Sequence, residues 1–441
     1  MPSERSTRVE PIYRPNGNDG AIIVYAGKLA VEAGGTSGDA VGQLELRLFP
    51  GASFGARFSG PPSKVSPHLV VDLHASVTGV PPGSSLTPPT KSSLPSRPGR
   101  GSWVESNVRL SNLDAGELSA AVRFVVHLSQ SFQHPEFRVL TQLADGSRQG
   151  QVAFRLPGWN LVLAPIDDPR GDHDFGAAIA ATPTRSPVDT ASIERLQHYL
   201  FFVLSLVSSR EVGIGPTCGL DRKGRVVWAN WGSPRLRPEK SFATWCPKQL
   251  VPTAVESVAD GYAQLGTDRA LEVVVERAIN HLLSADSSEV LDVRVPVACT
   301  GLELLSWAVL RRQGWITQDT SSSRKLDTAA RLRLLLAWAG VSADIPDGFD
   351  ALLARKKALG KPDDGGPETL HNVRNAVIHA PRKFDDPEWP DSDELFEAWQ
   401  LSTWCLQLCL LRVLGYDGDY WSRLRLARSS LDVEPVPWAA R

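Results

Sequence analysis

The sequence predicts an α+β protein of at least two domains, with a mostly β N-terminal region followed by an all-helical C-terminal region. A chain of 441 residues is longer than one ordinary core requires. Short segments of alternating polarity fill the N-terminal third of the chain. Beyond about residue 265, apolar residues recur instead at three- and four-residue spacing. These two periods are those of half-buried strands and of amphipathic helices, so they place the change of architecture.

Strand signals dominate the N-terminal region, which we assign to residues 1–255. Clusters of Gly, Pro, Ser and Asn separate short segments in which polar and apolar residues often alternate. Such alternation is typical of antiparallel strands with one face against a core, and it predicts a sandwich or a barrel. The clearest segments are residues 21–26, 43–49, 69–74, 120–128 and 151–156. Residues 80–102 are dense in Pro, Ser and Gly, and they predict a flexible surface loop.

A helix and a hairpin are expected near the end of this region. Apolar residues at positions 193, 196, 200, 203 and 207 predict a helix over about 190–208. The Asp-Arg-Lys-Gly turn at 221–224 leads into a strand-like segment, which predicts a hairpin attached to the β domain. The boundary therefore lies beyond the hairpin, and we place it at 255/256.

Nearly every later segment reads as a helix, so residues 256–441 are expected to form one helical bundle. The predicted helices cover about 268–283, 298–312, 325–338, 349–359, 368–379 and 392–414. Short polar loops join them, which favours an up-and-down arrangement. Strand signals are almost absent here.

The composition is that of a soluble globular protein. The chain is 42% hydrophobic and 22% charged, and its formal net charge of −2 excludes a global basic field for coating nucleic acid. The five cysteines include no C-x-x-C pair, which favours a reducing compartment. The N-terminus lacks a signal-peptide core, and the apolar run at 199–207 is too short to span a bilayer. We therefore expect a cytoplasmic protein with no membrane segment.

The predicted helix 368–379 carries the residues that point to chemistry. Its sequence is ETLHNVRNAVIH, and Pro381 follows closely, so His379 is expected in the last turn. Arg374 and His379 are five residues apart, which places them about 140° apart around a helix. The buried stripe is expected to contain Leu370, Val373, Val377 and Ile378.

Three residues of this helix form a motif, Arg374-Asn375-x-x-x-His379. An arginine five residues before a histidine is common by chance, but the adjacent asparagine and the late position in a helical bundle make the pattern specific. The motif and its context resemble the HEPN superfamily, whose ribonucleases carry an R-N-x-x-x-H or closely similar motif on one helix of an α-bundle. The resemblance covers about residues 265–441. More loosely, the whole chain resembles bacterial defence-associated proteins in which a β-rich region precedes a HEPN domain.

The residue types suit metal-independent cleavage of RNA. His379 can exchange a proton with a ribose 2′-OH or a leaving 5′-oxygen near neutral pH. Arg374 offers a charged planar fork to phosphate oxygens, and Asn375 can hold the histidine or the phosphate in place. The resemblance further implies a homodimer through the HEPN domain, with a composite site that uses both chains, and a toxic role in antiphage defence. We expect no cofactor and no metal.

Three other residues are candidates for substrate binding: His371, Glu303 and Lys383. His371 lies one turn before Asn375, although a solvated or supporting histidine is the simpler interpretation. Glu303 lies in an otherwise apolar helix, where a plain surface position is the alternative.

Several further residues have a structural interpretation that competes with a functional one. Basic residues could draw RNA to the cleft or could simply lie on solvated helix faces: Arg311, Arg312, Arg331, Arg333, Arg355, Lys356 and Lys357. The acidic segment 167–174 is expected to be a polar turn, and Cys405 and Cys409 are expected to pack in the core. Trp228 and Trp231 could stack a base, but core filling is the default.

Two alternatives to the nuclease remain open at this point. The HEPN fold could serve as a non-catalytic module that binds a nucleotide or a partner protein. Alternatively, the β region could be a ligand-binding sandwich that the helices only dimerise. The RNA substrate, the activating signal and the ligand of the N-terminal region do not follow from the sequence.

Overall fold

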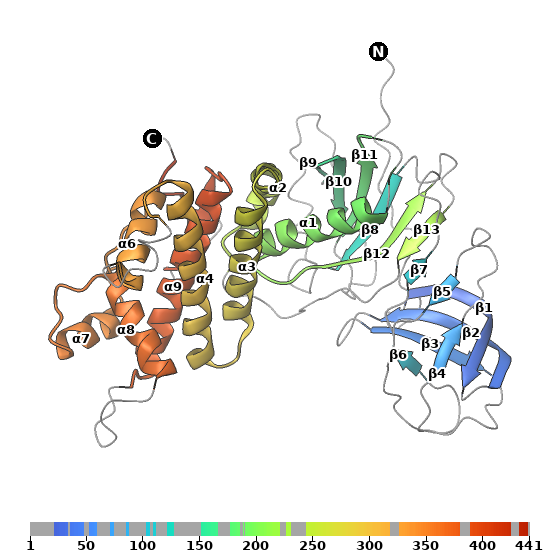
Figure 1. Ribbon diagram of the computed structural model, residues 1–441, viewed down its shortest axis with the longest axis horizontal. Helices are drawn as coiled ribbons and strands as arrows, with labels where there is room; N and C mark the ends of the chain where they lie inside the picture. Colours follow the sequence, from blue (N-terminus) through green and yellow to red (C-terminus); the bar gives the residue numbers. More distant parts are fainter. Residues whose placement is uncertain are drawn as a thin grey trace, which may run out of the picture. The chain divides into compact units, whose positions relative to one another are not determined.

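The structure is a computed structural model of the whole chain (Figure 1). Before residue 151 it describes the backbone of the strands alone. Beyond that point it describes residues 151–165, 177–185, 188, 190–220, 226–230, 244–317, 326–379, 389–424 and 432–439. Strands come first and helices follow, so the coarse α+β prediction is confirmed.

The chain divides into two compact units. The first contains Met1–Phe201 and Glu211–Lys240, and the second contains Phe202–Arg210 and Ser241–Arg441. The predicted boundary at 255/256 therefore falls inside the second unit, within helix α2 (Val251–Leu265). This position could not be predicted, because no change of hydrophobic period separates α2 from the helices that follow it.

The strands of the first unit form two antiparallel sheets. The first sheet has the order β4-β1-β2-β3-β6, with β1 Ile22–Ala33, β2 Thr36–Arg47, β3 Ser53–Ser59, β4 Val71–His74 and β6 Trp103–Glu105. The second has the order β5-β7-β13-β12-β8-β11-β10-β9. Its strands are β5 Ser85–Thr87, β7 Arg109–Ser111, β8 Ala121–His127, β9 Val152–Leu156, β10 Trp159–Pro165, β11 Ala177–Pro183, β12 Gly213–Leu220 and β13 Val226–Asn230. A sandwich or barrel arrangement of these sheets stays a prediction.

All five predicted strand segments overlap strands, and the predicted hairpin is the antiparallel pair β12–β13. In β9, buried and exposed residues alternate as its sequence predicts. The predicted loop at 80–102 is partly wrong, because β5 lies within it and pairs with β7. The rest of that loop and the acidic segment 167–174 lie outside the described residues.

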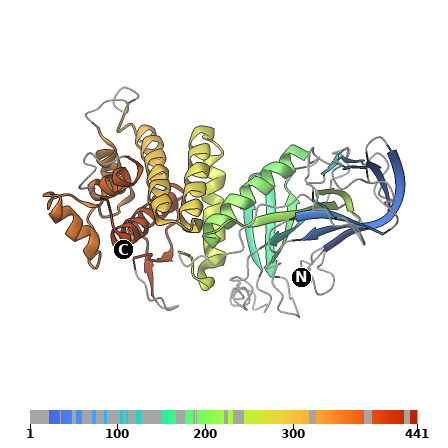
Figure 2. The ribbon, with the colours of Figure 1, turned by 90° about the horizontal axis from the view of Figure 1, so that it is seen from below.

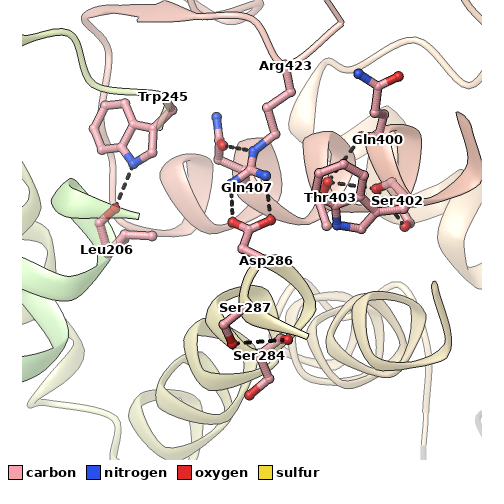
Figure 3. A network of polar contacts seen from close by, with 11 residues as sticks. Leu206, Trp245, Ser284, Asp286, Ser287, Gln400, Ser402, Thr403, Gln407 and Arg423 are labelled. Atoms are coloured by element: carbon pink, nitrogen blue, oxygen red, sulfur yellow. Dashed lines mark hydrogen bonds and ion pairs between the residues drawn. The ribbon is translucent and has the colours of Figure 1, made fainter. Parts of the chain in front are cut away.

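Helix α1 (Thr190–Ser208) follows β11, and its five predicted core residues are all buried. Within the second unit, the end of this helix meets Trp245, whose Nε1 donates to the Leu206 carbonyl at 2.8 Å (Figure 3). The Trp245 ring is fully buried and contacts Tyr416, with 5.0 Å between ring centroids. Trp245 is thus a core residue of the helical unit, although it precedes the first helix predicted there.

After the end of α1, the described helices of the second unit are α2, α3 Arg269–Ser287, α4 Leu291–Arg312, α6 Thr328–Ala339, α7 Asp350–Ala358, α8 Gly366–Ile378 and α9 Ser392–Val413. Asp268, Asp327 and Asp391 cap the N-termini of α3, α6 and α9, as short polar side chains do. Helix α4 begins seven residues before its predicted start, with Pro296 inside it. A short antiparallel ribbon, β14 (Asp419–Trp421) and β15 (Val433–Pro435), follows α9 and was not predicted.

Helix α4 lies at the centre of this bundle, where it packs against α3, α6, α8 and α9. It runs beside α3 in both views (Figures 1 and 2). At Gly301 there is no room for a side chain, because a Cβ would come within 2.8 Å of Leu406 of α9. Among the described helices, α4 alone is long and apolar enough to cross a bilayer, but half of its apolar window is buried inside the protein. Its apolar character is that of a core helix, and the cytoplasmic location stays a prediction.

Candidate functional site

The contacts of helix α8 fix its rotation about its own axis, and this rotation decides where the side chains of its motif point. At its start the Gly365 amide donates to Glu368, and Arg333 of α6 binds the same carboxylate through two hydrogen bonds of 3.2 and 2.5 Å. Leu370 and Val373 are buried, as predicted. Ile378, however, is 42% exposed and Val377 is only half-buried, so the predicted apolar stripe is wrong at its C-terminal end.

A second anchor of α8 is Arg355 of α7. Its Nε donates to Asn372 Oδ1 at 3.0 Å, and its Nη1 donates to Glu394 Oε2 of α9 at 2.7 Å. Arg355 is buried, so both interpretations considered for it, an RNA-attracting cation and a solvated helix face, are wrong. Its sequence neighbours, Lys356 and Lys357, gave no indication of this burial.

With α8 so oriented, four polar side chains come together: Glu303, His371, Arg374 and Asn375. Arg374 Nη1 donates to Asn375 Oδ1 at 2.9 Å, and Asn375 Nδ2 lies 2.9 Å from His371 Nε2. On the other side, Arg374 Nη2 lies 3.9 Å from Glu303 Oε1 of α4. We call these four residues the Arg374 cluster.

The Arg374 cluster is only partly covered. The side chains of Arg374 and Glu303 are 23% and 28% exposed, and His371 and Asn375 are half-buried. At 3.9 Å the arginine and the glutamate attract each other, but they are too far apart for a good hydrogen bond. Two nitrogens of the cluster, Arg374 Nε and His371 Nδ1, are buried and have no hydrogen-bond partner. The guanidinium is therefore incompletely paired, and its side chain is partly exposed.

Glu303 and His371 thus lie where the less favoured interpretation placed them, next to Arg374 and Asn375. Their roles stay predictions. Lys383 lies outside the described residues, so its position is not compared.

His379 lies apart from the Arg374 cluster. It is the C-cap of α8, with an extended backbone, and its side chain is exposed. Its backbone amide donates to the Asn375 carbonyl at 3.0 Å, but no described hydrogen bond or ion pair joins its imidazole to Arg374. The structure leaves the imidazole accessible.

Beneath the cluster lies Cys299 of α4, which the sequence did not mark. Burial and, to a lesser extent, the charge of Glu303 raise the pKa of its thiol to about 12, while Arg374 opposes the shift. Cys405 and Cys409 are also buried, so the core packing predicted for them is confirmed. In the described part of the chain, no three His, Cys, Asp or Glu side chains gather in a way that could hold a metal ion.

The site lies in a region of the chain that is similar to known proteins. Residues 268–434 match the family described as the YopA C-terminal domain. Over 450 residues, the chain is 23% identical to the SPbeta prophage-derived uncharacterized protein YopA of Bacillus subtilis (strain 168), and the match covers 95% of each chain. No solved structure matches. The matched domain includes α8 and the Arg374 cluster, and the likeness to the B. subtilis protein extends over both units.

Proposed function

We propose that this protein is an endoribonuclease of HEPN type that cleaves RNA without a metal ion. The observation that carries the proposal is the Arg374 cluster: the guanidinium of a partly exposed arginine is fixed by a neighbouring amide, on a helix whose C-cap is an exposed histidine. A phosphate anion could take up the donors of Arg374 that are loosely paired with Glu303.

The reaction that these groups suit is transesterification at phosphorus. The ribose 2′-oxygen attacks the adjacent phosphorus and loses its proton to a base, while the 5′-oxygen leaves and accepts a proton. Imidazole can perform either proton transfer, and His379 is free to do so. The guanidinium of Arg374 stabilises the negative charge that grows on the phosphate oxygens. The products are a 2′,3′-cyclic phosphate end and a 5′-OH end.

The separation of His379 from Arg374 within one chain favours a composite site. In a homodimer built through the HEPN domain, the motif helices of two chains can face each other, so that the phosphate meets the arginine of one chain and the histidine of its partner. We propose this dimer as the active form. RNA is then the substrate and no cofactor takes part.

The biological setting that we propose is conflict between phage and host. One relative of the chain is named as a prophage-derived protein, which supports a role as a toxic effector in the cytoplasm of a bacterium. The N-terminal sheets would then receive the activating signal, since they lie in a separate compact unit.

One observation favours a second candidate function. Because the imidazole of His379 does not contact Arg374, a single chain could bind a phosphate group of a nucleotide without cleaving anything. The helical unit would then act as a binding module on the same fold.

Digestion of RNA separates the two candidates. Purified protein is incubated with total cellular RNA in EDTA, and the new ends are sequenced, with His379→Ala protein as the control. If the protein is a nuclease of this kind, the wild type should produce 2′,3′-cyclic phosphate ends that the control does not produce. Intact RNA at all protein concentrations, or cleavage that requires added magnesium, would overturn the proposal.

A further inference from the structure

His371 and His379 lie on the same helix but in different chemical situations. His379 is exposed at the end of α8, whereas His371 is half-buried and its Nε2 lies 2.9 Å from Asn375 Nδ2. The donors and acceptors around His371 determine which of its ring nitrogens carries the proton.

Arg374 fixes the orientation of the Asn375 amide. A guanidinium has only donors, so the Asn375 atom that lies 2.9 Å from Arg374 Nη1 must be the acceptor, Oδ1. The other end of the amide, Nδ2, is a donor only and faces His371. His371 Nε2 must then accept this hydrogen bond, which requires a bare ring nitrogen.

The opposite arrangement loses one hydrogen bond and places two donors against each other. If His371 Nε2 carried a proton, the amide would have to turn and present Oδ1 to the histidine. Its NH₂ group would then face the donors of Arg374, and the charge-assisted hydrogen bond would be lost. The arrangement that satisfies most groups is a neutral His371 with its proton on Nδ1, the nitrogen that is buried without a partner.

We infer that His371 is a positioning residue: as a neutral imidazole protonated at Nδ1, it locks the Asn375 amide and through it the guanidinium of Arg374. Its Nε2 is occupied by this contact and its Nδ1 is buried, so His371 does not exchange protons with the substrate. The two histidines then have different roles: His371 orients the arginine, and His379 is left for proton transfer. The effect of His371 on RNA cleavage rests on the proposed function, whereas the position of the proton on its imidazole does not.

The form of the imidazole is measured by NMR on the full-length protein labelled with ¹⁵N-histidine. Of the nine histidines, His371 is identified by the signals that disappear in His371→Gln protein. We expect Nε2 to show the shift of a bare nitrogen in the wild type and of a protonated nitrogen in Asn375→Asp. A carboxylate can only accept, so it demands the proton on Nε2. A protonated Nε2 in the wild type, or an unchanged Nε2 in a folded Asn375→Asp variant, would overturn the inference.

A second arm measures cleavage by His371→Ala and His371→Gln proteins of matched folded fraction. The glutamine oxygen can accept from Asn375 Nδ2, whereas alanine cannot. We expect His371→Ala to lower kcat about ten-fold with little change in KM, and His371→Gln to restore most of the loss. Equal activity of wild type and His371→Ala would refute the positioning role. If the wild type cleaves no RNA, the proposed function fails, while the NMR result still decides the form of His371.

Discussion

Arg374 and Arg423 have the same kinds of partner but opposite surroundings. Each lies beside one carboxylate and donates to one side-chain amide: Glu303 and Asn375 for the first, Asp286 and Gln407 for the second. Arg423 binds Asp286 through two parallel hydrogen bonds of 2.7 and 2.6 Å, and both side chains are only 3% exposed (Figure 3).

The difference between the two arginines separates a structural site from a site open to a ligand. Each nitrogen of the Arg423 guanidinium has a partner, since Nε donates to Gln407 and both Nη groups bind Asp286, and these bonds tie the segment after β14 to α3 and α9. The fork of Arg374 is not saturated, because its carboxylate lies 3.9 Å away and its Nε has no partner. A phosphate has no place at Arg423, but it can compete with Glu303 for Arg374.

The largest effect is expected from breaking the buried pair. Arg423→Met leaves the Asp286 carboxylate buried without its partner, which should cost about 3–5 kcal/mol of unfolding free energy. The matched change at the partly exposed cluster, Arg374→Met, should cost less than about 1 kcal/mol. Urea unfolding of the two variants measures the difference.

The control for this pair is the double variant Arg423→Met/Asp286→Leu. It removes both charges, so it should regain most of the lost stability. Equal unfolding free energies for Arg423→Met and Arg374→Met would contradict the distinction drawn between the two arginines.

The next largest effect is expected when wild-type and inactive chains are mixed, because it depends on dimer formation. If one site draws on two chains, an excess of inactive His379→Ala protein should suppress wild-type cleavage beyond simple dilution, because mixed dimers pair a good motif with a defective one. Residual activity should follow the fraction of wild-type homodimer. Activity proportional to the wild-type fraction, or a monomer by light scattering at micromolar concentration, would show that each chain works alone.

A smaller effect is expected from Glu303→Gln. This change removes the carboxylate that competes with phosphate for Arg374, so a short RNA should bind a few-fold more tightly by fluorescence anisotropy. Its melting temperature should hardly change, because the pair is partly exposed. Weaker binding would instead mean that Glu303 itself holds the substrate.

The smallest effect is expected when the buried cysteine thiols of the folded protein are treated with an alkylating reagent. Burial raises the pKa of Cys405 to about 12, as it does for Cys299 beneath the cluster. Both should therefore stay unmodified by iodoacetamide at pH 8 in the folded protein and react only in urea. Rapid labelling of Cys299 in the native protein, detected by mass spectrometry, would show that the cluster opens in solution.

Helices were predicted well because their signals are local. Asp268, Asp327 and Asp391 cap the helices that follow them, and the apolar spacing of α1 matches its buried face. By contrast, β11 escaped prediction, since its sequence AAIAATP is rich in alanine, which has little preference for strands. It is a strand because β8 and β10 pair with it on both sides, and this pairing cannot be read from the segment itself.

The candidate site was predicted in part for a similar reason. Arg374, Asn375 and His379 share one helix and could be found from spacing. Glu303 comes from another helix, so only the packing of α8 on α4 brings it to Arg374. Likewise, the burial of Arg355 depends on α8 and α9, and its own helix carries no sign of it.

The most direct test of this account is the cleavage rate of one RNA in EDTA by wild type and by Arg374→Ala, compared at equal folded fraction. We expect metal-free cleavage by the wild type. We also expect Arg374→Ala to lower the rate about 100- to 1000-fold, the loss typical of removing one group that stabilises charge in a transition state. The melting curve of this variant should remain close to that of the wild type. Equal cleavage rates for the two proteins, or activity that EDTA abolishes and magnesium restores, would show that the guanidinium of Arg374 does not stabilise the transition state of metal-free cleavage.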